Sequence, residues 1–241
     1  MAHIILTGAT GTAGAGILSY ALTSPAISKI SILSRRAVKL ANDQPKAQVI
    51  IHNDFKVYSP EVLAQLKDAK ACIWAQGKSS MGMSEQDYTE LTLDYPLAAA
   101  KAFAGLGPQF NFVYMSGEGA NAEKETGQLF ARVKGRAERE LLKLQEQEPS
   151  LRVYNIRPGG IHPEGNYLAE RTPTMTDKGI RWLGAAFEKV YKSVVISTDS
   201  LAKASVKLAI GNGEPIPPGK GIEYDGRLIK NTALRRLAET G

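Results

Sequence analysis

A glycine-rich turn near the start of the chain constrains the fold more than any other feature of the sequence. Gly8, Gly11 and Gly14 recur at every third position. They follow the apolar run 3–7 and lie at the head of a helical pattern over 12–23. In such a unit the first glycine makes the tight turn, the second lets the backbone approach a diphosphate, and the third allows close helix–strand packing. The spacing predicts a dinucleotide site at the head of the helix; a glycine turn without a ligand is the alternative.

The second apolar run, 29–34, ends in two arginines. A site for unphosphorylated NAD requires an Asp or Glu at this point, to bind the ribose 2′-hydroxyl. The chain has Ser34, Arg35 and Arg36 there instead. Guanidinium groups pair with phosphates and stack on bases, and the serine adds a hydroxyl donor. The pattern therefore predicts NADP(H), with its additional 2′-phosphate; two solvated arginines are the alternative.

Two later turns fit the same nucleotide. Asp54 follows a third apolar run, 47–52, and we expect its side chain to bind the amino group of adenine. An ordinary turn before a helix is the alternative for this residue. Ala75, Gln76 and Gly77 end and follow a fourth run. Small residues at that point would let the cofactor's ribose pass close to the backbone.

Apolar runs alternate with helical patterns along most of the chain. The expected strands are 3–7, 29–34, 47–52, 69–75, 110–115, 151–156, 194–196 and 222–224. The expected helices are 12–23, 60–67, 84–104, 128–147, 180–189, 198–210 and 231–239. This alternation predicts an α/β fold, a doubly wound parallel sheet of the Rossmann type. We expect a single domain over 1–241, with a small substrate-side segment at about 161–197, because ligands bind beyond the carboxyl ends of the strands.

Composition narrows the class of partner. A single cysteine, Cys72, excludes an intrachain disulfide, and no apolar run is long enough for a transmembrane helix. The net charge is +6, but its densest group, within 134–143, is interleaved with acidic residues. We therefore expect a cytoplasmic protein with a small-molecule substrate and without nucleic-acid or membrane partners; a second copy of the chain or another protein is a further candidate partner. The histidines are far apart in the sequence, so no metal site is expected.

Several motifs together carry a family resemblance that covers about residues 1–160. They are TGATGTAG at 7–14, SRR at 34–36, AQG at 75–77, VYMSGEGA at 113–120, FARVKGRAE at 130–138 and RPGG at 157–160, with the Asp54 turn. Together they resemble an atypical short-chain dehydrogenase/reductase. The nearest likeness is to NAD(P)-binding proteins like HIV Tat-interacting protein 2 and to fungal nucleoside-diphosphate-sugar epimerase-like proteins. The resemblance implies an NADP-binding Rossmann fold.

The resemblance also implies an active site, with one departure. The family uses a serine after the fifth strand and a Tyr-x-x-x-Lys pair on the next helix. Ser116 and Lys134 match the serine and the lysine, but Phe130 stands at the tyrosine position. In the family, serine polarises the substrate carbonyl and lysine binds the nicotinamide ribose. Phenylalanine has no proton to give, so another group replaces it, or the chemistry needs no acid there, or the protein is not a carbonyl reductase.

Five other residues are candidates for the missing proton donor. His162 is the first to test, because it follows the RPGG turn at the mouth of the expected cleft and histidine is the side chain that most often serves as a general acid. The others are Tyr88, Tyr95, Tyr167 and Glu118. A packing or surface role is the alternative for each. The expected catalytic set is thus Ser116, Lys134 and His162.

The expected nucleotide set combines the motifs with the resemblance. It comprises Gly8, Thr10, Gly11, Thr12, Gly14, Ser34, Arg35, Arg36, Asp54, Ala75, Gln76, Gly77, Lys134, Pro158 and Gly159. The favoured function is an NADPH-dependent oxidoreductase acting on a small organic substrate. A regulatory protein that senses NADP(H) and a non-redox isomerase or cyclase that uses the same pocket are the alternatives.

Overall fold

The computed structural model describes residues 1–121, 123, 127–163, 165–170 and 194–240. The strands of its main sheet are β1 Ala2–Thr7, β2 Ile27–Ser34, β3 Ala47–Ile51, β4 Ala71–Trp74, β5 Phe110–Met115, β6 Leu151–Arg157, β9 Ile222–Glu223 and β10 Leu228–Lys230. A second, two-stranded sheet pairs β7 Gly160–His162 with β8 Val195–Ser197. The helices are α1 Thr12–Thr23, α2 Pro60–Gln65, α3 Glu85–Thr89, α4 Tyr95–Ala104, α5 Leu129–Gln147, α7 Thr198–Ile210 and α8 Asn231–Glu239, with short turns η1 Lys39–Ala41, η2 Glu90–Asp94 and η3 Asn166–Ala169.

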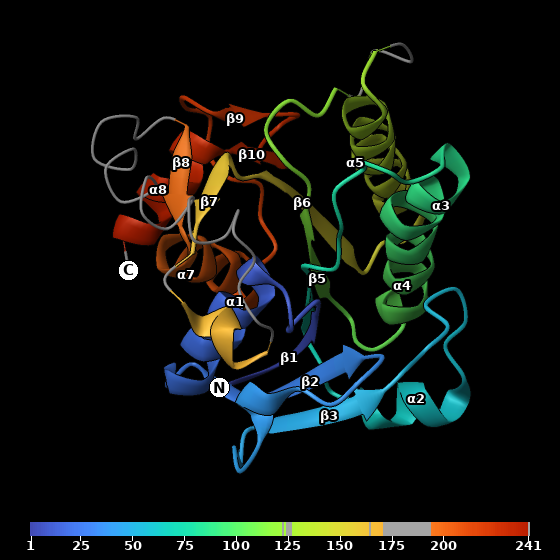
Figure 1. Cartoon of the computed structure of the whole chain (residues 1–241), viewed down its shortest axis with the longest axis vertical. Coiled ribbons are helices and arrows are strands. Elements are labelled where there is room, and N and C mark those ends of the chain that lie inside the picture. The colour runs from blue at the N-terminus through green and yellow to red at the C-terminus, as the bar shows by residue number, and fades with distance from the viewer. Residues whose placement is uncertain (122, 124–126, 164, 171–193, 241) are drawn as a thin grey trace.

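The strand order confirms the expected fold class. The main sheet runs β3-β2-β1-β4-β5-β6-β10-β9. All neighbouring pairs are parallel except β10 and β9, which pair in antiparallel fashion. The order of the first six strands reverses direction between β1 and β4, which is the doubly wound arrangement. Helices cover both faces of the sheet (Figure 1).

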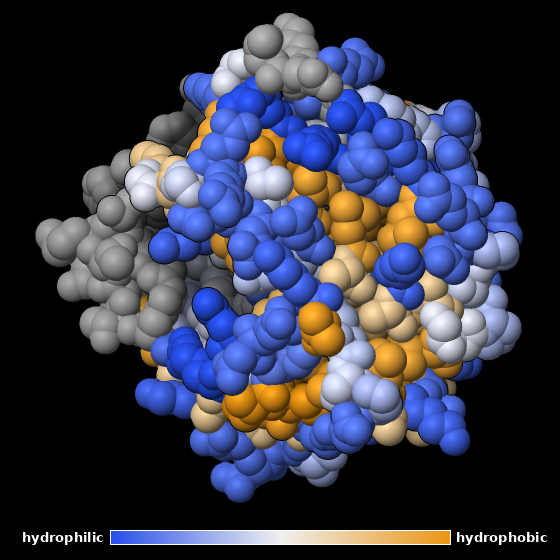
Figure 2. All heavy atoms as spheres, turned by 90° about the vertical axis from the view of Figure 1, so that its right-hand side faces the viewer, coloured by the Kyte–Doolittle hydropathy of each residue, from blue (hydrophilic) through white to orange (hydrophobic). Residues whose placement is uncertain are grey.

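Two apolar layers flank the sheet, and alternate residues of one strand feed both. On β1, Ile4 and Leu6 pack into the layer beneath α1, α7 and α8, whereas Ile5 packs into the layer beneath α4 and α5. Successive side chains of a strand point to opposite faces, so a strand buried on both sides is apolar throughout. Figure 2 shows the side covered by α3, α4 and α5, where apolar atoms emerge between hydrophilic ones. No helix in the described part of the chain has the length and apolar character needed to cross a bilayer.

The registers of the strands bring the predicted motifs to one edge of the sheet. Thr7, the last residue of β1, pairs with Leu33 on one side and Trp74 on the other. On the neighbouring strands, Trp74 pairs with Tyr114, and Met115 pairs with Ile156. The turns that follow these strands therefore meet at the carboxyl edge, where open α/β sheets bind ligands.

One expected helix is divided in the structure, and the main sheet contains a strand that the sequence pattern did not predict. The helix expected over 84–104 is divided into α3, a π-helical turn at η2, and α4, with Pro96 in the first turn of α4. Near the C-terminus the sheet contains β10, which was not expected. Its sequence, Leu-Ile-Lys, lies between two loops and is too short to show the periodicity of a strand. The expected helix at 180–189, and most of the expected substrate-side segment 161–197, lie outside the described residues.

Candidate functional site

In the glycine turn the backbone segments pack so closely that Gly8 and Gly14 leave no room for a side chain. Gly8 has φ +70°, and a Cβ atom there would lie 2.4 Å from the carbonyl oxygen of Ala75. A Cβ atom on Gly14 would lie 2.0 Å from the carbonyl oxygen of Gly8. Gly11 is the N-cap of α1, where no side chain caps the helix and the first turn contains no acidic residue. The head of α1 is therefore available to an anion, which its dipole and amides favour.

Beside this turn lies a pocket of about 260 Å³, which we call the arginine pocket. It is lined by Gly8, Thr10, Gly11, Leu33, Ser34, Arg35, Arg36, Phe55, Ala75, Gln76 and Gly77. Arg35 is exposed, and no ion pair to its guanidinium is present among the described residues. Arg36 is 53% exposed and lies 3.8 Å from the carboxylate of Glu170. The pocket thus has two guanidinium groups at its rim.

A second cavity continues from the first across the carboxyl edge. This serine–lysine cavity, of about 470 Å³, is lined by Gly11, Thr12, Ala13, Ala75, Gln76, Gly77, Lys78, Met115, Ser116, Gly117, Glu118, Phe130, Lys134, Pro158, Gly159, Gly160, Ile161 and Val194. It shares Gly11, Ala75, Gln76 and Gly77 with the arginine pocket. The two cavities therefore adjoin beside the head of α1, and we refer to them together as the trough.

The trough gathers most of the predicted nucleotide residues, and two lie outside its walls. Gly14 acts beneath it, in helix–turn packing. Asp54 is the other: its carboxylate accepts a hydrogen bond from the backbone amide of Lys56 at 2.9 Å, which closes a turn, and its contact with adenine stays a prediction. Phe55, which we had not predicted, lines the arginine pocket in its place. Lys78, directly after the AQG turn, was also missed; adjacency to a predicted residue was the one available signal for both.

Ser116 and Lys134 meet at the far end of the trough. The Ser116 Oγ atom is buried and has no hydrogen-bond partner in the described part of the chain. Lys134, on α5, donates from Nζ to the carbonyl oxygen of Met115 at 2.7 Å and lies 4.8 Å from the centre of the Tyr114 ring. Burial lowers the pKa of Lys134 to about 8, although the carboxylate of Glu138 opposes this shift. An ammonium group in this range exchanges its proton near neutral pH.

Phe130 contributes an apolar wall and no proton. It lies on α5 one turn before Lys134 and lines the same cavity. A Cβ atom on Gly117 would lie 2.9 Å from Cζ of the Phe130 ring, so the ring tip occupies the space that a side chain at 117 would fill. The glycine after Ser116 and the phenylalanine therefore fit each other as a packed pair.

Of the candidate proton donors, Glu118 lines the cavity. His162 is not among the described residues that line it: its neighbour Ile161 does, and successive side chains of the β7 strand point to opposite sides. The role of His162 as a proton donor stays a prediction. Tyr88 is fully buried in the apolar layer beneath α4 and α5, and Tyr95 donates to Glu90 at 2.8 Å. Tyr167 is buried in η3 and is not among the described residues that line these walls. In the described ranges, no group of three His, Cys, Asp or Glu side chains is arranged to hold a metal.

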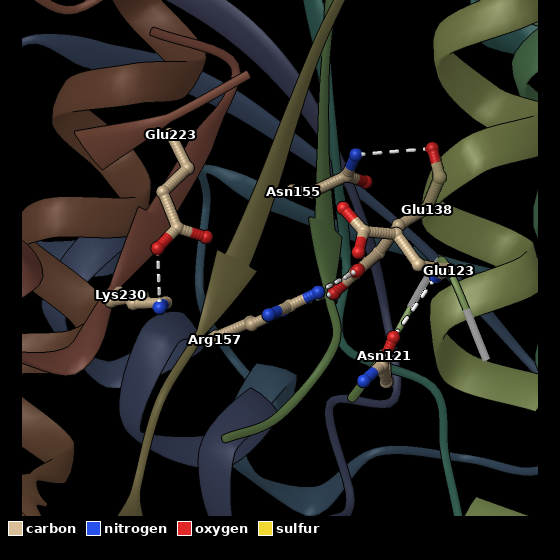
Figure 3. A network of polar contacts seen from close by, with 7 residues as sticks. All are labelled: Asn121, Glu123, Glu138, Asn155, Arg157, Glu223 and Lys230. Carbon is tan, nitrogen blue, oxygen red and sulfur yellow. Dashed lines mark hydrogen bonds and ion pairs between the residues drawn. The ribbon is translucent and has the colours of Figure 1, made fainter. Parts of the chain in front are cut away.

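A buried ion pair joins the helix that carries Lys134 to the end of β6 (Figure 3). Arg157, at the end of β6, donates to both carboxylate oxygens of Glu138 on α5, at 2.8 and 2.5 Å. Asn155 donates to the Glu138 carbonyl at 3.2 Å. Glu138 and Arg157 are only 1% and 7% exposed. The pair fixes α5, which carries Lys134, against the strand that leads to Pro158 and Gly159.

Replacing Arg157 by methionine is expected to lower the free energy of unfolding by about 3–5 kcal/mol, because Glu138 would remain buried without its counter-charge. Urea denaturation measures the loss. Lys230→Gln is the matched control: Lys230 pairs with Glu223 on the surface, the two being 32% and 41% exposed, and its loss should cost less than about 1 kcal/mol. Equal losses for the two variants would show that the buried pair adds nothing of its own.

The trough fits a nicotinamide dinucleotide in the donors that it offers. The uncapped head of α1 suits a diphosphate, and the guanidinium groups suit a further phosphate. Small residues at Ala75 and Gly77 leave room beside the backbone. The buried Ser116 hydroxyl, unpartnered among the residues described, is free to bond a ligand oxygen at the other end.

Comparison with known proteins gives relatives along the whole chain. No family model matches it. Leucinostatins biosynthesis cluster protein T of Purpureocillium lilacinum is 43% identical, over 98% of this chain and 95% of that protein. Protein fmp52, mitochondrial, of Emericella nidulans is 28% identical, over 91% of this chain and 92% of that protein. Among solved structures, a short-chain dehydrogenase/reductase of Saccharomyces cerevisiae superposes with a TM-score of 0.68 at 13% identity, covering 99% of both chains.

These names correct one expectation, the cytoplasmic location. Four relatives, from Emericella nidulans, Candida albicans, Aspergillus clavatus and Aspergillus fumigatus, are named mitochondrial proteins and are 25–28% identical to this chain. The expectation rested on cysteine content and charge, which do not determine the compartment to which a protein is delivered.

The identity to protein T extends over nearly the whole of both chains, whereas the likeness to the yeast enzyme is one of fold. The narrower resemblance to proteins like HIV Tat-interacting protein 2 stays a prediction. The chain belongs to the family of leucinostatins biosynthesis cluster protein T, and its Rossmann fold is that of the short-chain dehydrogenases/reductases.

Proposed function

We propose that this protein binds NADP(H) and transfers a hydride between it and a carbonyl or imine carbon of a small organic compound. One observation carries the proposal: the pocket rimmed by Arg35 and Arg36 adjoins the cavity lined by Ser116 and Lys134, and the two share lining residues. The first end suits a 2′-phosphate, and the second suits an oxygen that gains or loses a proton.

The nucleotide-binding roles divide along the trough. Arg35 and Arg36 bind the 2′-phosphate, and Ser34 contributes a hydroxyl donor. Amides at the head of α1 bind the diphosphate, with Gly8 and Gly14 holding the turn in shape. Lys134 binds the ribose hydroxyls next to the nicotinamide. Backbone at Ala75–Gly77 and at Pro158–Gly159 borders the path between these ends.

The reacting end needs a polariser and a proton. The nicotinamide, when bound, supplies or accepts the hydride. The Ser116 hydroxyl donates a hydrogen bond to the substrate oxygen. It is available for this because it has no hydrogen-bond partner among the described residues. The Nζ atom of Lys134 releases the proton that this oxygen takes up on reduction, because Phe130 cannot. Burial supports this role, since it brings the pKa of the ammonium to about 8.

A sensor of NADP(H) without turnover is the second candidate. The packing of Phe130 on Gly117 favours it, because the pair fills the place of a catalytic hydroxyl. The test is to follow NADPH absorbance while the purified protein is offered aldehydes, ketones and imines. Consumption of NADPH coupled to product supports the oxidoreductase. Tight binding of NADPH without turnover of any compound, unchanged by Phe130→Tyr, supports the sensor.

The pH profile should report Lys134. Reduction requires its protonated form, so kcat for reduction should be highest below about pH 8 and fall as the pH rises through the lowered pKa. Oxidation of the corresponding alcohol requires the neutral amine, so its rate should rise over the same range. Steady-state rates at saturating NADPH or NADP⁺ between pH 6 and pH 10, about two units around this pKa, measure both. A flat profile in both directions would contradict the assignment.

A further inference from the structure

Glu170 ties the described end of the substrate-side segment to the loop that carries the two arginines. It directly follows η3, which packs on α1, and its side chain is completely buried. Its Oε1 atom accepts a hydrogen bond from the backbone amide of Leu40 at 2.7 Å. Leu40 lies in η1, on the same loop as Arg36. The buried carboxylate is therefore fixed in position by the loop itself.

The same carboxylate contacts one edge of Arg36. Its Oε2 atom lies 3.8 Å from Nη1 of the arginine, and the Glu170 carbonyl accepts a hydrogen bond from Nη2 at 3.4 Å. Within the described residues Oε2 has no hydrogen bond, and the guanidinium of Arg36 is the one described cation within 4.0 Å of it. Arg36 remains 53% exposed and lines the arginine pocket.

A guanidinium group is planar and holds its N–H donors in a fixed fork. A carboxylate on one edge therefore orients the donors of the other edge. Here the engaged edge faces the buried Glu170, and the exposed part of the side chain borders the pocket. In NAD sites an acidic residue binds the 2′-hydroxyl directly. Glu170 instead reaches the pocket only through an arginine.

We propose that Glu170 positions Arg36 for the 2′-phosphate of the cofactor and so helps to select NADP(H) over NAD(H). The inference rests on the proposed nucleotide function and assigns this chain a specificity-determining residue far from the glycine motif. Glu170 is a positioning residue, because it acts on the nucleotide through Arg36. Through its contacts with Arg36 and Leu40, Glu170 also joins the substrate-side segment to the loop proposed to bind the 2′-phosphate.

Calorimetric titration of the whole chain with NADPH and with NADH tests this. Glu170→Gln keeps an oxygen that can accept from Leu40 and removes the charge. It should raise the Kd for NADPH by roughly 3- to 10-fold, the effect of weakening one charge-assisted contact, and change the Kd for NADH by less than about 2-fold. In an Arg36→Ala background the same change should have no further effect on NADPH, because the two residues act as one unit.

Glu223→Gln is the matched control, since Glu223 pairs with Lys230 at the opposite edge of the sheet. It should leave both affinities unchanged. Three results would overturn the inference: equal weakening of NADPH and NADH, tighter NADPH binding by Glu170→Gln, or a full effect that persists without Arg36. A wild-type protein that binds neither nucleotide refutes the proposed function instead, which is a separate result.

Discussion

Replacing Arg35 and Arg36 together by alanine is expected to raise the Kd for NADPH by roughly 10²- to 10³-fold and that for NADH by less than about 3-fold. Both guanidinium groups rim the pocket that adjoins the glycine turn, where the phosphate that distinguishes the two cofactors would lie. Hydrogen bonds between charged groups are stronger than neutral ones, so their loss is felt by NADPH alone. Calorimetry at one fixed ionic strength measures both constants, because salt screens exposed charges.

Lys39→Ala provides the matched control. It removes an exposed positive charge from the same loop, at η1, but Lys39 does not line the arginine pocket. We expect its NADPH affinity to stay within about 3-fold of the wild type, as for a screened surface charge. Equal losses of NADPH and NADH in the arginine variant would refute the 2′-phosphate assignment. No loss of either would make the two arginines solvated surface residues.

Sequence spacing predicted the strand–turn–helix unit and the carboxyl edge of the sheet well, because both are built from short-range geometry. A strand, a tight turn and a helix fix Gly8, Gly11 and Gly14 within one continuous segment. A Cβ atom on Gly8 or Gly14 would overlap backbone atoms, and one on Gly11 would lie 3.3 Å from the carbonyl oxygen of Gly8. Parallel strands then bring Arg35 and Ala75 to the same edge. The pattern of buried runs was sufficient to predict that edge.

Long-range contacts could not be predicted in the same way. Whether Asp54 or Phe55 faces the pocket depends on a turn that Asp54 closes with its own side chain. That Ile161 and not His162 lines the described cavity wall could not be predicted, because strand β7, and hence the alternation of its side chains, depends on pairing with β8. Glu170 meets Leu40 across a separation of 130 residues, for which no local pattern gives a signal.

Replacing Lys134 by methionine is expected to reduce kcat for reduction by roughly 10²- to 10⁴-fold at saturating NADPH, the usual effect of removing a general acid. Methionine keeps much of the apolar stem that packs over Tyr114, and it removes a charge whose burial is unfavourable. The variant should therefore unfold at a urea concentration no lower than that of the wild type. Lost turnover together with retained stability separates the loss of a proton donor from misfolding.

Lys78→Met makes the same chemical change at another lysine of the same cavity, one that is exposed. Its kcat should stay within about 3-fold of the wild type, because an exposed lysine remains solvated and has no part in the proposed proton transfer. Glu118→Gln tests the remaining ionisable candidate in the wall. If Glu118→Gln lost the activity while Lys134→Met kept it, the proton would come from the carboxyl group, and the role given to the buried ammonium would be wrong.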